Sequence, residues 1–457
     1  MQKMKNGKKV LSVCLSLAMA AGMLSTSAFA SWNVYGGSNN HNAVVTEAPT
    51  RPDKSGLDSY IQLHCTGSGW DGVDNVPVLQ TVNGTTYAYV LYDGYGASGA
   101  LVAKIRCAEN GGSSIVWTTD PYGTEGTSLN AKSGFQLSTP YLDDKGTPDD
   151  ASDDTLYVGT ISQYDDYEGG EWLTGTDSKV MALTGLDQNK PTVTNVLTGI
   201  NGQINTPITT DGTYLYFGTW PGGSNAGTYY QVKLSDYSVK TFTPDSYGFY
   251  WAGAVSDGTN VYFGSDNGLL YWRSIADFDT TGGVLDLTDV ASDAGNVRST
   301  VMLDDGYLYF TTQGGYLWCC SYDDGLTVEW HKKLGATSTS TPTKVGDRIY
   351  VGYYSGFNAG GVQCVSADGS SVKTVVEGDG FPVQSSIVVM GDGTGTDYLY
   401  FNTNAQKGVG YCYSYDGTTG SQVWGTTGDT YALGGMAIDN GYAVFGNDYN
   451  HLYVVHD

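Results

Sequence analysis

The sequence predicts an all-β protein that is built from one repeated hairpin. A short strand, an Asp-Gly or Gly-Asp turn and a strand of alternating aromatic residues recur along the chain. This pattern is typical of a β-hairpin, and its recurrence at a period of about 40 to 50 residues indicates a propeller or a solenoid. No apolar pattern of helical period is sustained after residue 30. The clearest copies are "INTPITTDGTYLYFG" (204–218), "WAGAVSDGTNVYFG" (251–264), "RSTVMLDDGYLYFT" (298–311) and "STPTKVGDRIYVG" (340–352).

Residues 1–30 have the pattern of a secretory signal peptide. Four lysines precede an apolar run from Val10 to Leu24, and Ala28-Phe29-Ala30 follows as a small-residue cleavage site. The run is shorter than the roughly 20 residues of a membrane span. Lipidation at Cys14 is the alternative, which Val13 disfavours because lipoprotein signals have a small residue there. We therefore expect an exported protein, secreted or associated with the cell surface, in which residues 31–56 form an extended lead-in.

The net charge of the chain excludes some classes of partner. The formal charge is −25, and the loss of the four leader lysines makes it −29. A domain this acidic does not bind nucleic acid or an anionic membrane through bulk electrostatics. Solubility outside the cell explains the acidity, with bound calcium as the alternative.

Eight repeat units can be counted after the lead-in. Several of them end in a fourth strand that closes on a tryptophan, at Trp117, Trp330 and Trp424. Four strands per unit make a propeller blade. The eighth unit ends after its third strand, and "LDSYIQLHC" (57–65) can supply the missing strand and close the ring, which removes both exposed edges. The sequence thus predicts an eight-bladed β-propeller of four-stranded antiparallel blades over residues 57–457, with seven blades as the alternative. The first strands begin near Val76, Thr139, Thr206, Ala252, Thr300, Thr341, Ser386 and Gly435.

The cysteines outside the leader follow the repeat. Cys319, Cys364 and Cys412 fall at one equivalent position of three consecutive units. Equivalent positions of adjacent packed sheets lie roughly 10 Å apart, beyond the reach of a disulfide. We therefore predict that these three are small buried apolar residues. Cys65 and Cys107 could pair, although nothing in the sequence compels it.

The repeat resembles a known family. A glycine after the second strand, a tyrosine-rich third strand, and "SYDGTTG" before Trp424 resemble the PQQ-type (quinoprotein-like) β-propeller repeat, over about residues 55–457. "GFYWAGA" and "LGATSTSTP" are similar to a branch found in secreted proteins of Gram-positive bacteria. The resemblance implies the fold, which hosts dehydrogenases, assembly scaffolds and binding modules alike.

One face of the predicted ring is rich in aromatic residues. The loops into the first strands and the loops between second and third strands share this face, and the insertion 162–177 is expected to overhang it. One equivalent position around the axis holds Ser138, Asn205, Trp251, Ser299, Ser340, Ser385 and Gly434. Small polar linings are common in propellers, but Trp251 departs from them. Flat apolar faces beside oriented donors suit a sugar or a peptide. The candidate ligand-binding residues are Trp251, Tyr250, Trp220, Trp70, Arg298, Gln384, Tyr353 and Asn205.

Catalytic motifs are not apparent. Quinoprotein dehydrogenases of the family that the chain resembles can hold PQQ beneath a ring formed by adjacent cysteines. Cys319 and Cys320 are adjacent, but they lie within a predicted strand, where neighbouring side chains point to opposite faces. The sequence has no C-x-x-C-H haem motif, and its five histidines are scattered. We therefore expect no catalytic residues, no PQQ and no other cofactor, apart from calcium.

Two acidic hairpins are candidate calcium sites. "DDKGTPDDASDD" (143–154) and "GDGTGTD" (391–397) lengthen turns between first and second strands. Clustered carboxylates supply the hard oxygen ligands that calcium prefers, but neither loop has EF-hand spacing, and a solvated acidic loop is the alternative. The candidate ligands are Asp143, Asp149, Asp153, Asp392 and Asp397.

These patterns predict a secreted, non-enzymatic and monomeric propeller without a membrane span. It is expected to bind an extracellular protein or glycan through its aromatic face. A quinone-dependent or carbohydrate-active enzyme is one alternative, because plentiful carboxylates could form a glycosidase pair. A structural component of a cell-envelope assembly is the other.

Overall fold

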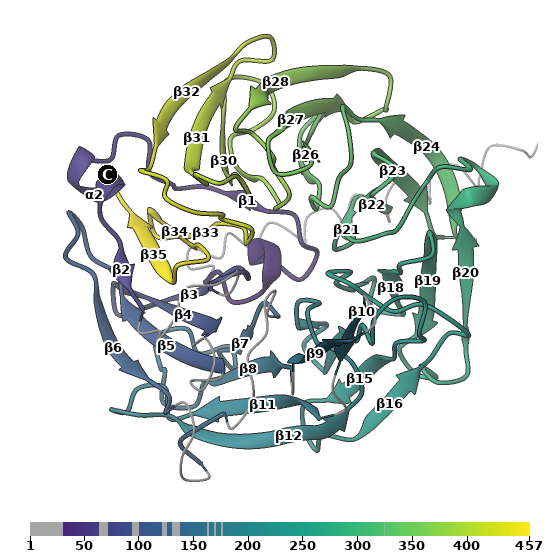
Figure 1. The fold of residues 1–457 in the computed structure, drawn as a ribbon, viewed down its shortest axis with the longest axis horizontal. Coiled ribbons are helices and arrows are strands. Elements are labelled where there is room, and N and C mark those ends of the chain that lie inside the picture. Colours follow the sequence, from purple (N-terminus) through teal and green to yellow (C-terminus); the bar gives the residue numbers. More distant parts are fainter. Residues whose placement is uncertain are drawn as a thin grey trace, which may run out of the picture. The chain divides into compact units, whose positions relative to one another are not determined.

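The prediction of eight blades is confirmed. The computed structural model describes residues 31–63, 72–93, 100–120, 126–129, 138–161, 164–168, 171–174, 177–323 and 325–457. Within these residues, eight sheets of antiparallel strands stand around a common axis, as Figure 1 shows. Helix is confined there to α2 (Lys54–Asp58) and the 3-10 turns η1 (Tyr35–Gly37) and η3 (Leu287–Asp289). No described helix is long and apolar enough to cross a membrane.

The first four blades follow one another in the sequence. Blade 1 consists of β3 (Val78–Val82), β4 (Thr85–Asp93), β5 (Ala100–Arg106) and β6 (Ser114–Thr118). Blade 2 consists of β7 (Tyr141–Asp143), β8 (Thr155–Thr160), β11 (Ser178–Thr184) and β12 (Thr192–Ile200). Blade 3 consists of β13 (Thr209–Thr210), β14 (Tyr214–Gly218), β15 (Tyr229–Lys233) and β16 (Val239–Phe242). Blade 4 consists of β17 (Val255–Ser256), β18 (Asn260–Gly264), β19 (Leu269–Ser274) and β20 (Gly282–Asp286).

The remaining blades complete the ring. Blade 5 consists of β21 (Met302–Asp304), β22 (Tyr307–Thr312), β23 (Tyr316–Ser321) and β24 (Thr327–Lys333). Blade 6 consists of β25 (Thr343–Val345), β26 (Arg348–Ser355), β27 (Ala359–Ser366) and β28 (Val372–Asp379). Blade 7 consists of β29 (Val388–Met390), β30 (Asp397–Asn402), β31 (Gly410–Tyr415) and β32 (Gly420–Gly425). Blade 8 consists of β33 (Ala437–Asp439), β34 (Tyr442–Gly446), β35 (His451–Val455) and β2 (Ile61–Gln62).

The predicted closing strand is confirmed. β2 pairs antiparallel with β35, with Ile61 opposite Leu452 and Gln62 opposite His451. The strand before blade 1 and the last strand of the chain therefore share one blade, and the ring presents no open first or last sheet. His64 and Cys65, which were expected to continue this strand, lie outside the described residues.

The repeated turn sequence explains the repeated hairpin. The carboxylate of Asp211 accepts hydrogen bonds from the backbone N–H groups of Thr213 and Tyr214, and from the Tyr216 hydroxyl, each at 2.8 Å. In blade 4, Asp257 makes the same three contacts at 2.7 Å. Gly212 follows Asp211 at a φ of +86°, a conformation that only glycine adopts readily. Contacts within five residues therefore set the turns of blades 3 and 4.

A glycine in the second strand of blades 2, 3, 4, 6 and 8 lets neighbouring blades approach closely. A Cβ at Gly264 would lie 2.2 Å from Cγ1 of Val297, and one at Gly218 would lie 2.6 Å from Cβ of Phe249. Val297 and Phe249 belong to the segment that leads into the following blade. The hydrophobic core accordingly lies between blades, as the cluster that joins Tyr262 of blade 4 to Trp318 of blade 5 illustrates.

The lead-in crosses the axis of the ring, which the sequence did not predict. Its backbone carbonyls at Trp32, Asn33, Asn40 and Ala43 accept hydrogen bonds from the first strands of blades 1, 2, 5 and 7. β1 (Val44–Val45) also pairs in parallel with β29. Figure 1 shows this segment, in purple, at the centre of the ring. The lead-in thus satisfies the inner edges of the blades and obstructs the axial channel.

The described cysteines occupy the predicted positions. Cys319, Cys364 and Cys412 each lie opposite a tyrosine of the second strand, namely Tyr309, Tyr350 and Tyr400. All three are buried and carry free thiols. The prediction that they act as small buried residues is confirmed. Cys107 is buried too, but its suggested partner lies outside the described residues.

Candidate functional site

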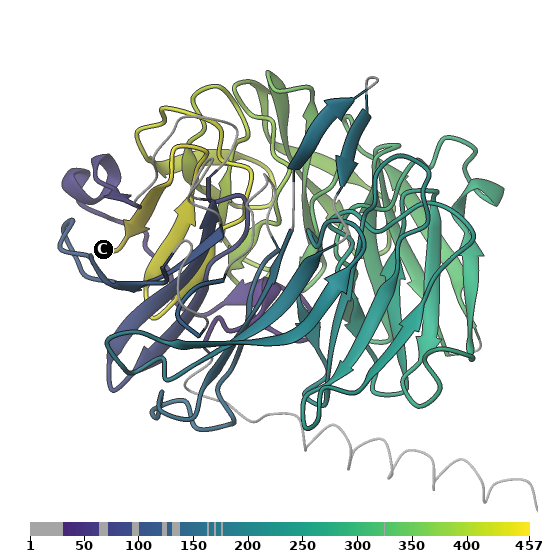
Figure 2. The same cartoon turned by 60° about the horizontal axis from the view of Figure 1, so that its bottom comes forward.

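Two kinds of loop share one face of the ring, which we call the loop face. These are the segments that lead into the first strands and the loops between second and third strands. The Trp220 and Tyr250 rings, one from each kind of loop, have centroids 5.1 Å apart in a T-shaped contact. The insertion of blade 2 forms the hairpin of β9 (Tyr164–Glu168) and β10 (Glu171–Thr174), which stands out from the ring in Figure 2. Its topology places it at the loop face.

A narrow hollow, the axial cavity, lies among the inner ends of the blades. It offers about 60 Å³ to the centres of water-sized molecules, and about 490 Å³ of empty space when its open mouth is included. Its lining comes from the segments that lead into all eight blades and from Tyr35 of the lead-in, whose hydroxyl lies 3.0 Å from that of Thr341. Tyr35 therefore brings the lead-in into the lining of the cavity at the axis. Its lining includes the side chains of Asp74, Asn75, Asn205, Trp251, Arg298 and Ser385.

Several polar atoms in this cavity have no hydrogen-bond partner among the described residues. Neither Oδ1 nor Nδ2 of Asn205 is bonded, although only 2% of this residue is exposed. Oδ1 of Asn75 and Oγ of Ser385 are likewise buried and unbonded. The Asn75 amide is oriented by its Nδ2, which donates to the carbonyl of Leu91 at 2.7 Å. Since a buried polar atom without a partner costs about 1–3 kcal/mol, these atoms point to a bound molecule or ordered water.

A charged and aromatic cluster borders the cavity. Nε and a terminal nitrogen of Arg298 donate to the two carboxylate oxygens of Asp266 at 2.8 and 2.6 Å. The Trp220 indole N–H also donates to Asp266, at 3.1 Å. The Arg298 guanidinium lies 4.3 Å from the centre of the Tyr250 ring. We call Trp220, Tyr250, Asp266 and Arg298 the Asp266–Arg298 cluster. They come from blades 3, 4 and 5, and their mutual contacts hold each side chain in place.

The electrostatics of the cluster favour the ion pair. Burial raises the pKa of Asp266, whereas hydrogen bonds and charge from Arg298 oppose that rise. Burial also disfavours the charged form of Arg298, but contact with Asp266 outweighs it and raises the pKa of the guanidinium. The arginine therefore stays charged and its charge is matched within the protein.

A wider hollow, the groove, lies on the other side of this cluster. It offers about 530 Å³ to the centres of water-sized molecules. Trp220, Tyr247, Asp266, Asn267 and Arg298 contribute to its lining, and Arg298 lines the axial cavity as well. Tyr247 is 36% exposed and has a φ of +64°, which is unusual for a residue other than glycine. The groove and the cavity therefore meet at one arginine.

Most of the predicted ligand-binding residues come together here. Asn205, Trp251, Gln384 and Arg298 line the axial cavity, and Trp220 lines the groove. Tyr250 is 8% exposed and supports Arg298 from within the protein. Trp70 lies outside the described residues.

Tyr353 and part of the predicted axial ring lie elsewhere. Tyr353 is buried, lines neither hollow and directs its hydroxyl to Glu377 at 3.3 Å. Ser138 donates to the carbonyl of Thr206 at 2.6 Å, and Ser299 donates to that of Thr311 at 3.2 Å. These serines therefore donate hydrogen bonds to backbone carbonyl groups within a blade or between blades, as small polar residues in propeller channels commonly do.

Sequence reasoning missed three contributors. Tyr35 was assigned to an extended lead-in, and no repeat signal placed it on the axis. Asn75 stands immediately before the first unit, and its position could have been found by extending the alignment of the units by one residue. Asp266 lies in a loop after Gly264, and the lone arginine at position 298 was the signal that an acidic partner was needed.

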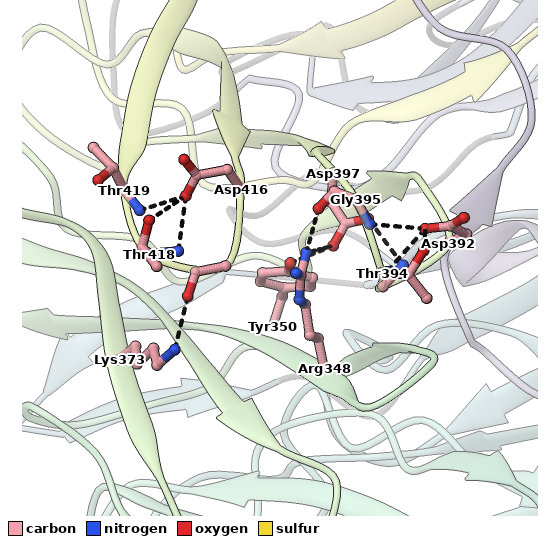
Figure 3. A network of polar contacts seen from close by, with 12 residues as sticks. Arg348, Tyr350, Lys373, Asp392, Thr394, Gly395, Asp397, Asp416, Thr418 and Thr419 are labelled. Atoms are coloured by element: carbon pink, nitrogen blue, oxygen red, sulfur yellow. Dashed lines mark hydrogen bonds and ion pairs between the residues drawn. The ribbon is translucent and has the colours of Figure 1, made fainter.

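The acidic hairpins bind their own chain. Asp397 is fully buried and accepts hydrogen bonds from Arg348 at 2.7 Å and from the Tyr350 hydroxyl at 2.6 Å, as Figure 3 shows. Asp392 accepts from the backbone N–H groups of Thr394 and Gly395. In the other hairpin, Asp143 pairs with Lys145, Asp149 contacts Asn83, and Asp153 contacts Thr147. No group of three or more metal-binding side chains is found among the described residues, and calcium binding stays a prediction.

Comparison with solved structures supports the fold. BamB from Moraxella catarrhalis superimposes with a TM-score of 0.51 at 14% identity, covering 86% of this chain and 100% of that one. A europium-containing methanol dehydrogenase does so with a TM-score of 0.58 at 12% identity, covering 91% and 89%. Sqt1 from Saccharomyces cerevisiae gives 0.52 at 11% identity, covering 90% and 100%. These likenesses support the β-propeller fold.

Comparison of the sequence with protein families and with curated proteins found no match. At the identities above, the solved structures establish the fold and leave the activity open, because enzymes and non-enzymes share it.

The described residues do not fit a quinone site. Cys320 packs in the cluster between blades 4 and 5, whereas Cys319 packs in that between blades 5 and 6. The two thiols thus point away from each other within β23, as predicted, and cannot form a ring above a cofactor.

Proposed function

We propose that this protein is an extracellular binding scaffold that recognises a protein or a glycan through its loop face. The observation that carries the proposal is the junction of the groove and the axial cavity at Arg298. An aromatic and charged cluster from three blades holds this junction rigidly, so binding requires little ordering of side chains. Rigid aromatic surfaces beside oriented polar groups are typical of ligand recognition.

The chemistry of the two hollows supports binding without catalysis. Their described lining residues include no histidine, cysteine, lysine or glutamate. Asp266 is engaged by Arg298 and Trp220, so it is poorly placed to act as a base or a nucleophile. Recognition would rest on shape, stacking and hydrogen bonds. Export by the leader at residues 1–30 belongs to the same proposal, and recovery of the protein from the culture medium tests it.

A matched pair of tyrosine variants tests the binding face. Tyr247 lines the groove and is 36% exposed, whereas Tyr307 is 38% exposed and directly follows a turn on the opposite face. The mature protein should be screened on glycan arrays and against extracellular protein extracts, and each hit measured by calorimetry. Tyr247→Ala should weaken binding about tenfold, which corresponds to about 1.4 kcal/mol, and Tyr307→Ala should not. Equal affinity of both variants for every hit would overturn the proposal.

A further inference from the structure

We infer that the axial cavity receives the uncharged, hydroxyl-rich terminal sugar of a glycan. This inference rests on the proposed function and names the ligand class of the same face. It starts from the unbonded atoms of Asn205, Asn75 and Ser385, which line one hollow. Asn205 is the strongest of these, because both atoms of its amide are buried and unbonded.

The mixture of donors and acceptors favours hydroxyl groups. Nδ2 of Asn205 can only donate, Oδ1 of Asn205 and Oδ1 of Asn75 can only accept, and Oγ of Ser385 can do both. A metal ion would engage the oxygen atoms and leave the amide nitrogen without a partner. An ammonium group would only donate. Neighbouring hydroxyls of a sugar donate and accept at once, so they match the whole set.

The charges of the lining disfavour an anionic ligand. Arg298 is the only lysine or arginine among the described residues that line the cavity, and Asp266 already neutralises it with two hydrogen bonds. A carboxylate or phosphate would therefore lose its hydration without gaining a free cation. A neutral ligand avoids this cost.

The walls of the cavity fit the end of a sugar chain. Trp251 offers an aromatic surface at a position where the other blades carry small residues, and its backbone holds a φ of +59°. Such a strained conformation is retained where the surrounding structure requires it, commonly at binding sites. Tyr35 adds a second aromatic side chain to the lining. A terminal sugar can enter this narrow cavity, while the preceding sugars lie in the groove that shares Arg298 with it.

The experiment compares variants of the cavity and of the groove on defined sugars. The probes are neutral oligosaccharides ending in glucose, galactose, mannose or N-acetylglucosamine, their uronic-acid-terminated counterparts, and the same chains after removal of the end sugar. Calorimetry measures wild type, Asn205→Ala, Ser385→Ala and Tyr247→Ala. Thermal unfolding without ligand is recorded in parallel. Because Asn205 is unbonded in the free protein, Asn205→Ala should not lower the melting temperature.

The outcomes separate the inference from the proposed function. We expect one neutral terminal sugar to bind, with a loss of about tenfold or more in Asn205→Ala and after removal of that sugar. If Tyr247→Ala loses affinity while Asn205→Ala and Ser385→Ala do not, the inference is wrong and the proposed function stands. Preference for the uronic-acid chains, or binding of a protein and no glycan, also overturns the inference. If no variant changes the affinity for any bound probe, both are wrong.

Discussion

Arg298 donates two hydrogen bonds to Asp266, at 2.6 and 2.8 Å, across the boundary between blades 5 and 4. The pair separates the axial cavity from the groove and contributes to both linings through Arg298. The pair therefore couples the packing of two blades to the shape of the candidate site. A substitution of either residue should change both the packing of the blades and the shape of the site.

Breaking this ion pair should destabilise the protein. Asp266→Asn leaves Arg298 largely buried without a counter-charge, so we expect a loss of about 2 kcal/mol or more in the free energy of unfolding. Arg298→Gln should cost a similar amount. The double variant should recover at least about 1 kcal/mol relative to the sum of the two, because it leaves no lone charge. Denaturant titration measures this, and strictly additive losses would show that the two charges are not coupled.

The glycine at the end of a second strand should not tolerate a side chain. Gly264→Ala places a Cβ 2.2 Å from Val297, which must move and separate blades 4 and 5. We expect a loss of about 1–3 kcal/mol in stability, which is typical of overpacked cores. Gly395→Ala is the matched control, because a Cβ there meets nothing within 4 Å. Similar melting temperatures for both variants would contradict the role of the glycine in blade packing.

Asp439 should give the fold a measurable pH dependence. This carboxyl lies between blades 8 and 1, where it accepts a hydrogen bond from Thr81 at 2.8 Å, and burial raises its pKa from 3.8 to about 6. Because the folded pKa is the higher one, the stabilisation is fully present below pH 3.8 and is lost as the pH rises through 6. The uncharged Asp439→Asn should thus melt about 2 °C above wild type at pH 8.

The pH trend, rather than one temperature, tests this assignment. The advantage of Asp439→Asn should shrink between pH 6 and pH 4, as the wild-type carboxyl becomes protonated in the fold. Differential scanning calorimetry across this range measures it. Asp279→Asn, at an exposed position, should show no such trend. A constant difference between Asp439→Asn and wild type from pH 4 to pH 8 would contradict the burial of this carboxyl.

The five described cysteines should be inert in the native protein. Burial raises the pKa of Cys107, Cys319 and Cys412 to about 12 and that of Cys364 to about 11, so little thiolate exists at neutral pH. Cys320, beside Cys319, has a raised pKa for the same reason. In a mature Cys65→Ser protein, Ellman's reagent should detect no thiols before unfolding and all five afterwards. Rapid reaction of any thiol in the native state would contradict this burial.

Much of the fold could be predicted because its signals are local. The Asp-Gly turns set the hairpins through contacts within five residues, as between Asp211 and Tyr216. The aromatic alternation identified the second strands, and the count of units identified the strand that closes blade 8. Half of the candidate site could also be predicted from the sequence, because Asn205, Trp251 and Arg298 hold equivalent or neighbouring positions in their repeat units.

The sequence by itself determined the hairpin, the blade and the number of blades, because each depends on residues that are neighbours in the chain. Only the tertiary structure decided that Tyr35 lines the axial cavity, that Asp266 meets Arg298, and that Tyr353 lies away from the site. Tyr35 and Thr341 are 306 positions apart, and Asp266 and Arg298 are 32 apart. Such contacts depend on how the ring closes and on which side chains fill its centre, and no local propensity encodes either.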